Sequence, residues 1–127
     1  MATPTPTSLD LHLPADPQLL RVMRLTASGM ASLGHLDLAS TEEVRVAVDE
    51  LVSRMIGVSD GAPLHVAFQL TAGSLCVEVS TELPDGAEIE PDPLSERLLD
   101  ALSTTHQWSV RDGRAVGRVE KQLPPSG

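Results

Sequence analysis

The sequence contains few aromatic residues, a single cysteine and few basic residues. Phe68 and Trp108 are its only large aromatic side chains and it has no tyrosine, so aliphatic residues and methionine must build the core. Cys76 cannot form an internal disulfide, and its apolar neighbours favour a buried thiol over a nucleophile. The formal charge of −9 argues against nucleic-acid binding, because contacts with phosphate groups need a basic surface.

Several kinds of segment and motif are also missing. No apolar run is long enough to span a bilayer, so we expect no membrane-spanning segment. The first eight residues, MATPTPTS, lack the basic and apolar regions of a signal peptide, which favours a cytoplasmic protein. There is no Walker A or Rossmann glycine pattern, and the four histidines lack metal-ligand spacing. We therefore predict no metal site.

The hydrophobic pattern predicts one domain over residues 9–122, between a disordered tail at 1–8 and a short tail at 123–127. Alternating leucines at 9, 11 and 13 are typical of a half-buried strand. A helix is predicted over residues 15–34, with Asp16 as its N-cap, Pro17 at its first position and Gly34 at its end. Its apolar stripe consists of Leu19, Met23 and Met30, and Val22, Thr26, Gly29 and Leu33 lie beside it.

A second helix is predicted to begin at Ser40 or Thr41 and to end near Gly57. Glu43 follows Ser40 by three residues, which matches a capping box. The apolar stripe of this helix consists of Val44, Val48, Leu51, Val52 and Met55.

Two β-hairpins and a short helix complete the pattern. The hairpins are predicted over residues 64–80 and 106–122, with the second turning at Asp112-Gly113, and the helix is predicted over 94–104. Adjacent strands can pair antiparallel while the helices collect on one face. The element order therefore predicts an α/β two-layer sandwich.

Residues 47–55, AVDELVSRM, lie in the second predicted helix. Glu50 and Arg54 are four residues apart, so one helical turn would stack them as an ion pair of about 0.3–0.5 kcal/mol. The same spacing suits two side chains on one wall of a ligand pocket. The residues alone leave three roles open for Glu50: an ion pair, a catalytic or nucleotide contact, and a partner contact.

Two longer phrases connect this helix with a known family. LHLPADPQLLRVMRLTASGMAS, residues 11–32, and STEEVRVAVDELVSRMI, residues 40–56, resemble the first strand and helix and the N-box helix of the anti-sigma-factor serine kinases. WSVRDGRAVGRVEKQ, residues 108–122, is similar to their final hairpin. These kinases belong to the GHKL ATPase superfamily. The resemblance implies the Bergerat fold, with a mostly antiparallel sheet and helices on one face.

The resemblance also assigns roles to residues of the second helix. In that family a glutamate polarises the attacking hydroxyl, and an asparagine four residues later holds Mg²⁺. Glu50 takes the catalytic position and Arg54 the position of the metal ligand. An arginine has no lone pair for a metal, although it could contact a phosphate directly. A frame shifted by one residue would pair Asp49 with Ser53 instead.

The other nucleotide-binding motifs of the family are altered as well. Its Asp-x-Gly-x-Gly motif is reduced to Asp85-Gly86, which is either a remnant of the adenine contact or a plain turn. These residues lie in an acidic loop at 82–92, which is either solvated or a docking surface. The later glycine-rich motif reads PDPLSE, residues 91–96, where Asp92 and Glu96 would repel a phosphate group.

The altered motifs favour a regulator over an enzyme. The leading hypothesis is an anti-sigma-factor-like protein that binds a sigma factor, a STAS-domain antagonist or both, with ATP binding lost or weak. It implies no cofactor, although ATP and Mg²⁺ would bind if the motifs still function, and a homodimer is possible. The first alternative is an active serine/threonine kinase of an antagonist protein, with Glu50 as its base. The second is a sensor-associated interaction domain unrelated to sigma factors.

Overall fold

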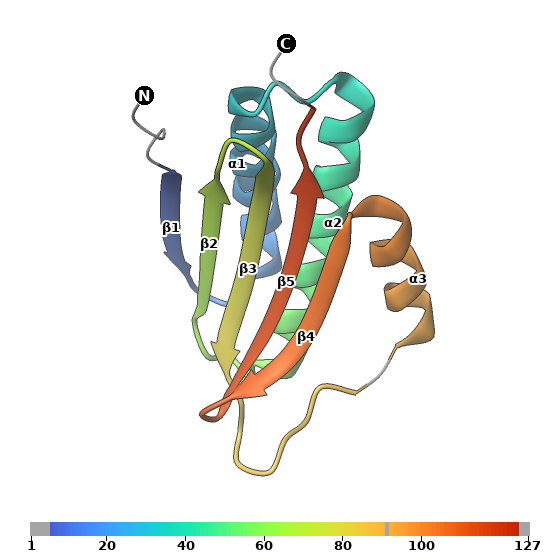
Figure 1. Ribbon diagram of the computed structural model, residues 1–127. Helices are drawn as coiled ribbons and strands as arrows, with labels where there is room; N and C mark the ends of the chain where they lie inside the picture. Colours follow the sequence, from blue (N-terminus) through green and yellow to red (C-terminus); the bar gives the residue numbers. More distant parts are fainter. Residues whose placement is uncertain (1–5, 91, 125–127) are drawn as a thin grey trace.

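The computed structural model describes residues 6–90 and 92–124, which form a sheet and a layer of helices (Figure 1). The strands are β1 (Thr7–Leu13), β2 (Leu64–Leu70), β3 (Ser74–Glu82), β4 (Thr105–Arg111) and β5 (Arg114–Gln122). The helices are α1 (Leu20–Leu33), which follows a 3₁₀ turn at Pro17–Leu19, α2 (Leu38–Val58) and α3 (Pro93–Leu102).

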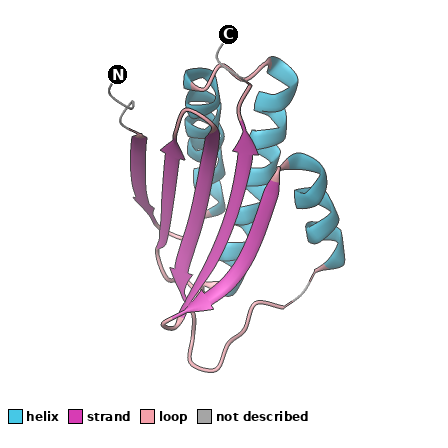
Figure 2. Cartoon of the chain, viewed as in Figure 1, coloured by secondary structure: helices cyan, strands magenta, loops and turns pink. Residues whose placement is uncertain are grey.

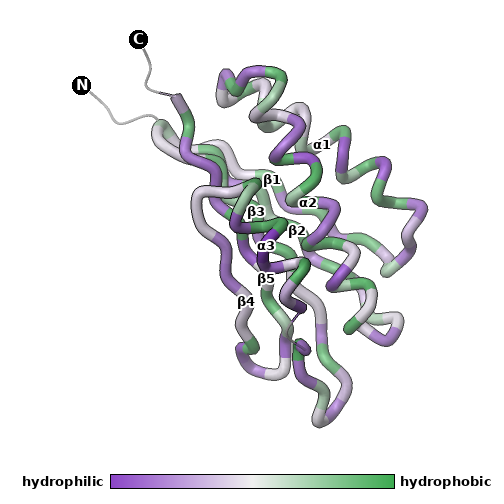
Figure 3. Tube along the Cα trace, turned by 90° about the vertical axis from the view of Figure 1, so that its right-hand side faces the viewer, coloured by the Kyte–Doolittle hydropathy of each residue, from purple (hydrophilic) through white to green (hydrophobic). Residues whose placement is uncertain are grey.

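The five strands pair in the order β1-β2-β3-β5-β4, and every pair is antiparallel. β1 and β4 are therefore the two edge strands. The helices lie on one face of this sheet (Figure 2), and a view along its edge shows the two layers (Figure 3). This arrangement confirms the predicted α/β two-layer sandwich, and the predicted hairpins are β2–β3 and β4–β5.

The turn between β4 and β5 fixes how these two strands pair. Asp112 and Gly113 both have positive φ angles, 51° and 76°, as a two-residue type I′ turn requires. The register that follows places Trp108 opposite Gly117. The indole of Trp108 therefore lies against a residue that has no side chain.

The core lies between the sheet and the helices. α2 buries all five residues of its predicted stripe together with Ala47. α1 differs from its prediction in part, because it buries Met23, Ala27, Met30 and Ala31 but leaves Val22 and Leu33 exposed. The small alanines allow α1 to pack closely against its neighbours, so the helix turns this face inward rather than the face with Val22 and Leu33.

The predicted N-cap of the second helix, Ser40 or Thr41, is wrong by three or four residues. α2 begins at Leu38, and the N-cap is Asp37, whose carboxylate accepts a hydrogen bond from the Ser40 N–H at 2.7 Å. This bond lowers the pKa of Asp37. Glu43 forms no capping box, because its carboxylate contacts Lys121 of β5. The predicted cap Asp16 lies at the 3₁₀ turn that precedes α1, where it accepts from the Gln18 N–H at 2.9 Å. The N-cap of α1 itself is Leu19, which makes no side-chain capping bond.

The ordered structure extends slightly beyond the predicted domain limits. β1 begins at Thr7, so the last two residues of the predicted N-terminal tail belong to a strand. At the other end the Leu123 N–H donates to the Gly73 carbonyl at 3.0 Å. The remaining predicted tail segments at 1–5 and 125–127 lie outside the described residues. Among the described residues, no helix has both the length and the hydrophobicity needed to cross a bilayer.

Candidate functional site

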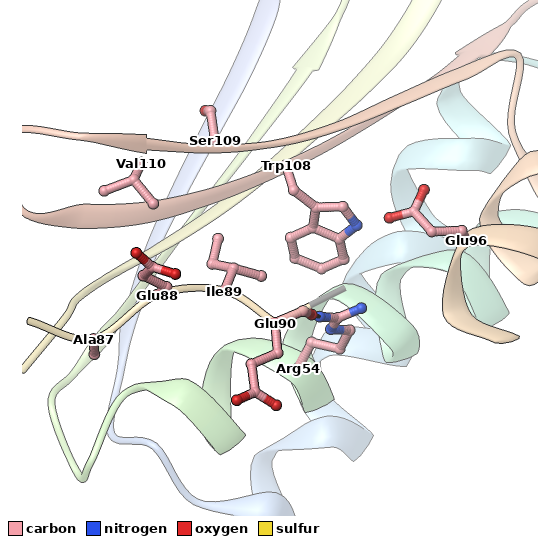
Figure 4. A pocket seen from close by; sticks show the side chains of 9 residues that line it. All are labelled: Arg54, Ala87, Glu88, Ile89, Glu90, Glu96, Trp108, Ser109 and Val110. Atoms are coloured by element: carbon pink, nitrogen blue, oxygen red, sulfur yellow. Dashed lines mark hydrogen bonds between the residues drawn. The ribbon is translucent and has the colours of Figure 1, made fainter. Parts of the chain in front are cut away.

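A cavity of about 670 Å³ lies where β4, α3, the acidic loop and α2 meet (Figure 4). α2 contributes one lining residue and α3 another, while the acidic loop and β4 contribute the remainder. The lining residues are Arg54, Ala87, Glu88, Ile89, Glu90, Glu96, Trp108, Ser109 and Val110. The cavity therefore combines an apolar wall with three carboxylates and one guanidinium group.

Trp108 forms the centre of the apolar wall. Its indole lies over Gly117, the residue opposite it in β5: a Cβ atom added at Gly117 would stand 2.5 Å from Trp108 Cζ3 and 2.9 Å from Cε3. The same Cβ atom would stand 3.1 Å from a methyl group of Leu51 in α2. The glycine thus creates the space in which the indole fits between the sheet and α2.

Arg54 extends from α2 toward this indole. Its Cζ atom lies 4.7 Å from the ring centroid, within the range of a cation–π contact. Its Nη2 atom donates a hydrogen bond to the Glu90 carbonyl in the acidic loop. In Figure 4 the Glu90 carboxylate points away from Trp108, so the loop presents its backbone to the guanidinium. Arg54 therefore joins α2, β4 and the acidic loop.

Two buried donors at this site have no hydrogen-bond partner among the described residues. They are Arg54 Nη1 and Trp108 Nε1. Figure 4 shows the indole nitrogen on the side of the ring that faces Glu96. Because buried donors are normally paired, these two atoms suit a ligand that carries acceptor oxygens.

α3 is attached to β4 through a histidine. His106 lies between two carboxylates of the helix, with Nε2 at 2.5 Å from Glu96 and Nδ1 at 3.2 Å from Asp100. The N-terminus of the helix is capped by Asp92, which accepts hydrogen bonds from Leu94 N–H and Ser95 N–H. These contacts fix the position of Glu96 at the cavity and leave the first amides of α3 already paired.

The acidic loop has open space on both sides. A second cavity of about 430 Å³ lies between the loop and the end of α2, and Arg54, Glu88 and Glu90 line both cavities. The loop is held by the contact with Arg54, by the partly buried Ile89, and by a hydrogen bond of 2.9 Å from Leu83 N–H to the Gly113 carbonyl.

The expected ion pair between Glu50 and Arg54 is not formed among the described residues. Arg54 instead contacts the Glu90 carbonyl and Trp108, and Glu50 does not line the cavity. The shifted frame also leads elsewhere, because Asp49 pairs with Arg24 of α1 at 2.7 Å and Ser53 is exposed. Of the residues considered on α2, the structure brings Arg54 to the cavity.

Asp85 and Gly86 lie at the exposed tip of the acidic loop. They occupy the centre of a turn closed by a hydrogen bond of 3.0 Å from Ala87 N–H to the Pro84 carbonyl, and Gly86 has a φ angle of 77°. A glycine adopts this conformation without strain. Neither residue lines the cavity beside Trp108.

Of the nine lining residues, the sequence motifs had marked only Arg54 and Glu96, so Trp108, Ile89 and Glu90 are among those that were missed. A signal for Trp108 was present, because the predicted turn at Asp112-Gly113 already determines that a lone tryptophan stands opposite a strand glycine. No local signal marks the Glu90 carbonyl, which is 36 residues from Arg54 in sequence.

Cys76 lies away from this cavity, in the centre of the sheet. It is buried, as predicted, and its Sγ atom accepts a hydrogen bond from Arg118 Nε at 2.9 Å. Burial raises the pKa of this thiol despite the neighbouring guanidinium. In the part of the chain that the structure describes, no group of three or more His, Cys, Asp or Glu residues could hold a metal ion.

The family of the chain follows from comparisons with known proteins. Residues 13–115 match the histidine kinase-like ATPase domain. The match runs from the end of β1 to the start of β5, so it includes every element that lines the cavity. A comparison with curated proteins gave no match. The five-stranded antiparallel sheet with helices on one face agrees with the Bergerat-type fold of this family. The chain therefore belongs to the histidine kinase-like ATPase domain family, of the GHKL type.

Proposed function

We propose that this chain is an anti-sigma-factor-like regulator that acts by binding a protein partner and has lost ATP binding or retains it only weakly. The partner is a sigma factor, a STAS-domain antagonist or both. The family membership supplies the fold, and the resemblance of residues 11–32 and 40–56 to the anti-sigma-factor kinases supplies the partner classes.

The observation that carries this proposal is the position of Arg54. The resemblance expects a Mg²⁺-ligating asparagine there, whereas a guanidinium has only donors and a positive charge. This guanidinium is already bound to the Glu90 carbonyl and to the face of Trp108. Mg²⁺ would meet a fixed cation at the place where it needs an oxygen ligand, so the residues present do not fit Mg²⁺ as the family binds it.

The charges around the cavity also fit ATP poorly. Glu88, Glu90 and Glu96 line it, and Arg54 is the one cation among its lining residues. The N-terminus of α3 offers no free anion site, because Asp92 already accepts from its first amides. A triphosphate would therefore meet repulsion from the three carboxylates, which one guanidinium does not offset.

Titration calorimetry with ATP and Mg²⁺ tests the loss of nucleotide binding. We expect no saturable heat with ATP concentrations up to about 1 mM, which would place any binding free energy weaker than about −4 kcal/mol. Titrations with ADP and with ATP in EDTA serve as controls. Mg²⁺-dependent binding in the micromolar range would refute this part of the proposal.

The partner classes are tested with purified proteins from the source organism. We expect the chain to co-elute with one of its sigma factors or STAS-domain proteins on size-exclusion chromatography. The Glu50→Ala variant should form the same complex, because binding does not depend on a catalytic carboxylate. Transfer of radiolabelled phosphate from ATP to a STAS-domain protein, abolished by Glu50→Ala, would instead establish an active kinase.

A further inference from the structure

The outer edge of β4 is open to an additional strand. β4 is the last strand of the sheet, and Figure 3 views the molecule from this side. The two-residue turn makes Arg111 and Arg114 a hydrogen-bonded pair, and such pairs then recur at every second residue. The backbone groups of Trp108 and Val110 therefore point away from β5, and they have no backbone partner among the described residues.

The cavity lies along this edge and is bordered by the same residues. Trp108 and Val110 both line it, and Val110 is 52% exposed, so an apolar side chain is accessible at this edge. An extended segment paired with β4 would place every second side chain beside these two residues.

The charges at the edge select a basic segment. Glu88, Glu90 and Glu96 line the cavity, and of these Glu96 also contacts His106 of β4. The guanidinium of Arg54 is already bound to the Glu90 carbonyl and stacked on Trp108, so the carboxylates outnumber the available cations. Cationic side chains on an added segment would gain contacts with these carboxylates, and acidic ones would be repelled.

We propose that β4 binds an extended segment of a partner protein by strand addition, with an apolar side chain in the cavity beside Trp108 and basic side chains facing Glu88 and Glu96. The proposal rests on the protein-binding function above and specifies where and how the partner binds. A second copy of this chain fits the edge less well, because pairing β4 with β4 would bring two sets of these carboxylates together.

Trp108 provides the assay, since it is the only tryptophan in the chain. The probes are end-blocked peptides of about ten residues, which is enough to span an edge strand. Valine or leucine occupies alternate positions, and lysine, serine or glutamate fills the others. Binding to the full chain is followed by tryptophan emission at low and high salt. We expect the lysine peptide to bind with a Kd of about 100 μM and the glutamate peptide at least about tenfold more weakly.

Two pairs of variants separate the backbone and charge contributions. Val110→Pro removes the outward N–H at a position where an edge strand tolerates proline, and Val110→Thr keeps this N–H. Glu88→Lys reverses a charge at the cavity, and Asp85→Lys makes the same change on the same loop away from it. We expect Val110→Pro and Glu88→Lys each to weaken binding of the lysine peptide about fivefold, with much smaller effects for their controls.

Several results would overturn strand addition. They are equal binding of the three peptides, no change in emission with any peptide up to about 1 mM, and equal effects of Glu88→Lys and Asp85→Lys. A dimer in sedimentation experiments that Val110→Pro dissociates would show that a second copy occupies the edge. ATP titration of the same samples distinguishes the two proposals. Tight binding of Mg²⁺-ATP would refute the proposed loss of nucleotide binding. If neither ATP nor any peptide binds, only the proposal of strand addition is refuted.

Discussion

The packing of Trp108 on Gly117 leads to a quantitative prediction for the substitution Gly117→Ala. The added Cβ atom would stand 2.5 Å from Trp108 Cζ3 and 3.1 Å from Leu51 Cδ2. Trp108 and Leu51 are parts of a packed layer, so the indole must shift. Overpacking of this kind costs about 1–3 kcal/mol, and the lower chain entropy of alanine offsets about 0.4–1 kcal/mol of it. We expect a net loss of about 1–2 kcal/mol in the free energy of unfolding.

A double-mutant cycle tests whether Trp108 is the cause of this loss. In a Trp108→Leu background the ring atoms are absent, so Gly117→Ala should cost less, with a coupling energy of about 1 kcal/mol. Urea unfolding followed by far-UV circular dichroism gives the four free energies, since tryptophan emission is lost in two of the proteins. Gly29→Ala on the exposed face of α1, where no atom lies within 4 Å of the new Cβ, is the control and should be stabilising.

Two results would contradict this role of Trp108: an equal cost of Gly117→Ala in both backgrounds, and stabilisation of the protein by Gly117→Ala as by Gly29→Ala. The first result would assign the loss to the strand backbone. The second would mean that the indole does not occupy the space above Gly117.

Three further predictions concern other parts of the fold. Asp37→Ala should lower the melting temperature at pH 7, because the pKa of Asp37 is lowered in the folded protein and the ionised cap stabilises the fold above the unfolded pKa. The difference in melting temperature between the variant and the unsubstituted protein should vanish as the pH falls through the folded pKa. Absence of this convergence in melts at several pH values would contradict the capping role. Cys76 should react slowly with a disulfide reagent at pH 8 and rapidly in urea, because its thiol is buried and its pKa is raised; fast reaction of the native protein would contradict its burial. Leu99→Ala should cost about 2–5 kcal/mol in urea unfolding, because this fully buried side chain joins α3 to the core, whereas Leu94→Ala at an exposed site should cost little; equal costs would contradict this packing.

Much of the fold could be predicted because the information is local. The apolar stripe of α2 and the alternation in the strands depend on residues only a few positions apart. The turn at Asp112-Gly113 fixes the register of a whole hairpin. The family match agrees with the Bergerat fold and the GHKL superfamily that the resemblance implied.

The wrong predictions concern residues whose partners lie far away in the sequence. Both Asp37 and Ser40 are good N-caps, and the choice between them depends on where the chain arrives from α1. Glu43 fits a capping box by local rules, yet it contacts Lys121, 78 residues later. Arg54 was paired with Glu50 on the same helix, whereas its contacts come from the acidic loop and β4. Local rules rank the nearby partners, but the packing of distant segments decides among them.

The contacts of Arg54 also predict how the ATP site would respond to repair. Under the proposed function, Arg54 blocks the metal position together with Trp108, and Gly117 makes room for the indole. These three residues come from three different elements, and the acidic loop contributes the Glu90 carbonyl. Replacing the arginine alone would remove one part of a cooperative arrangement and leave the indole and the carboxylates in place.

Arg54→Asn should therefore not restore ATP binding, although it supplies an amide oxygen at the position of the expected metal ligand. The variant should loosen the acidic loop, because the loop loses its contact with α2. Faster amide hydrogen exchange in residues 83–90, relative to an Arg24→Asn control on α1, would report this change. Micromolar binding of Mg²⁺-ATP by Arg54→Asn in calorimetry would contradict the argument, because it would show that the arginine alone excludes the nucleotide and that the rest of the site still fits it.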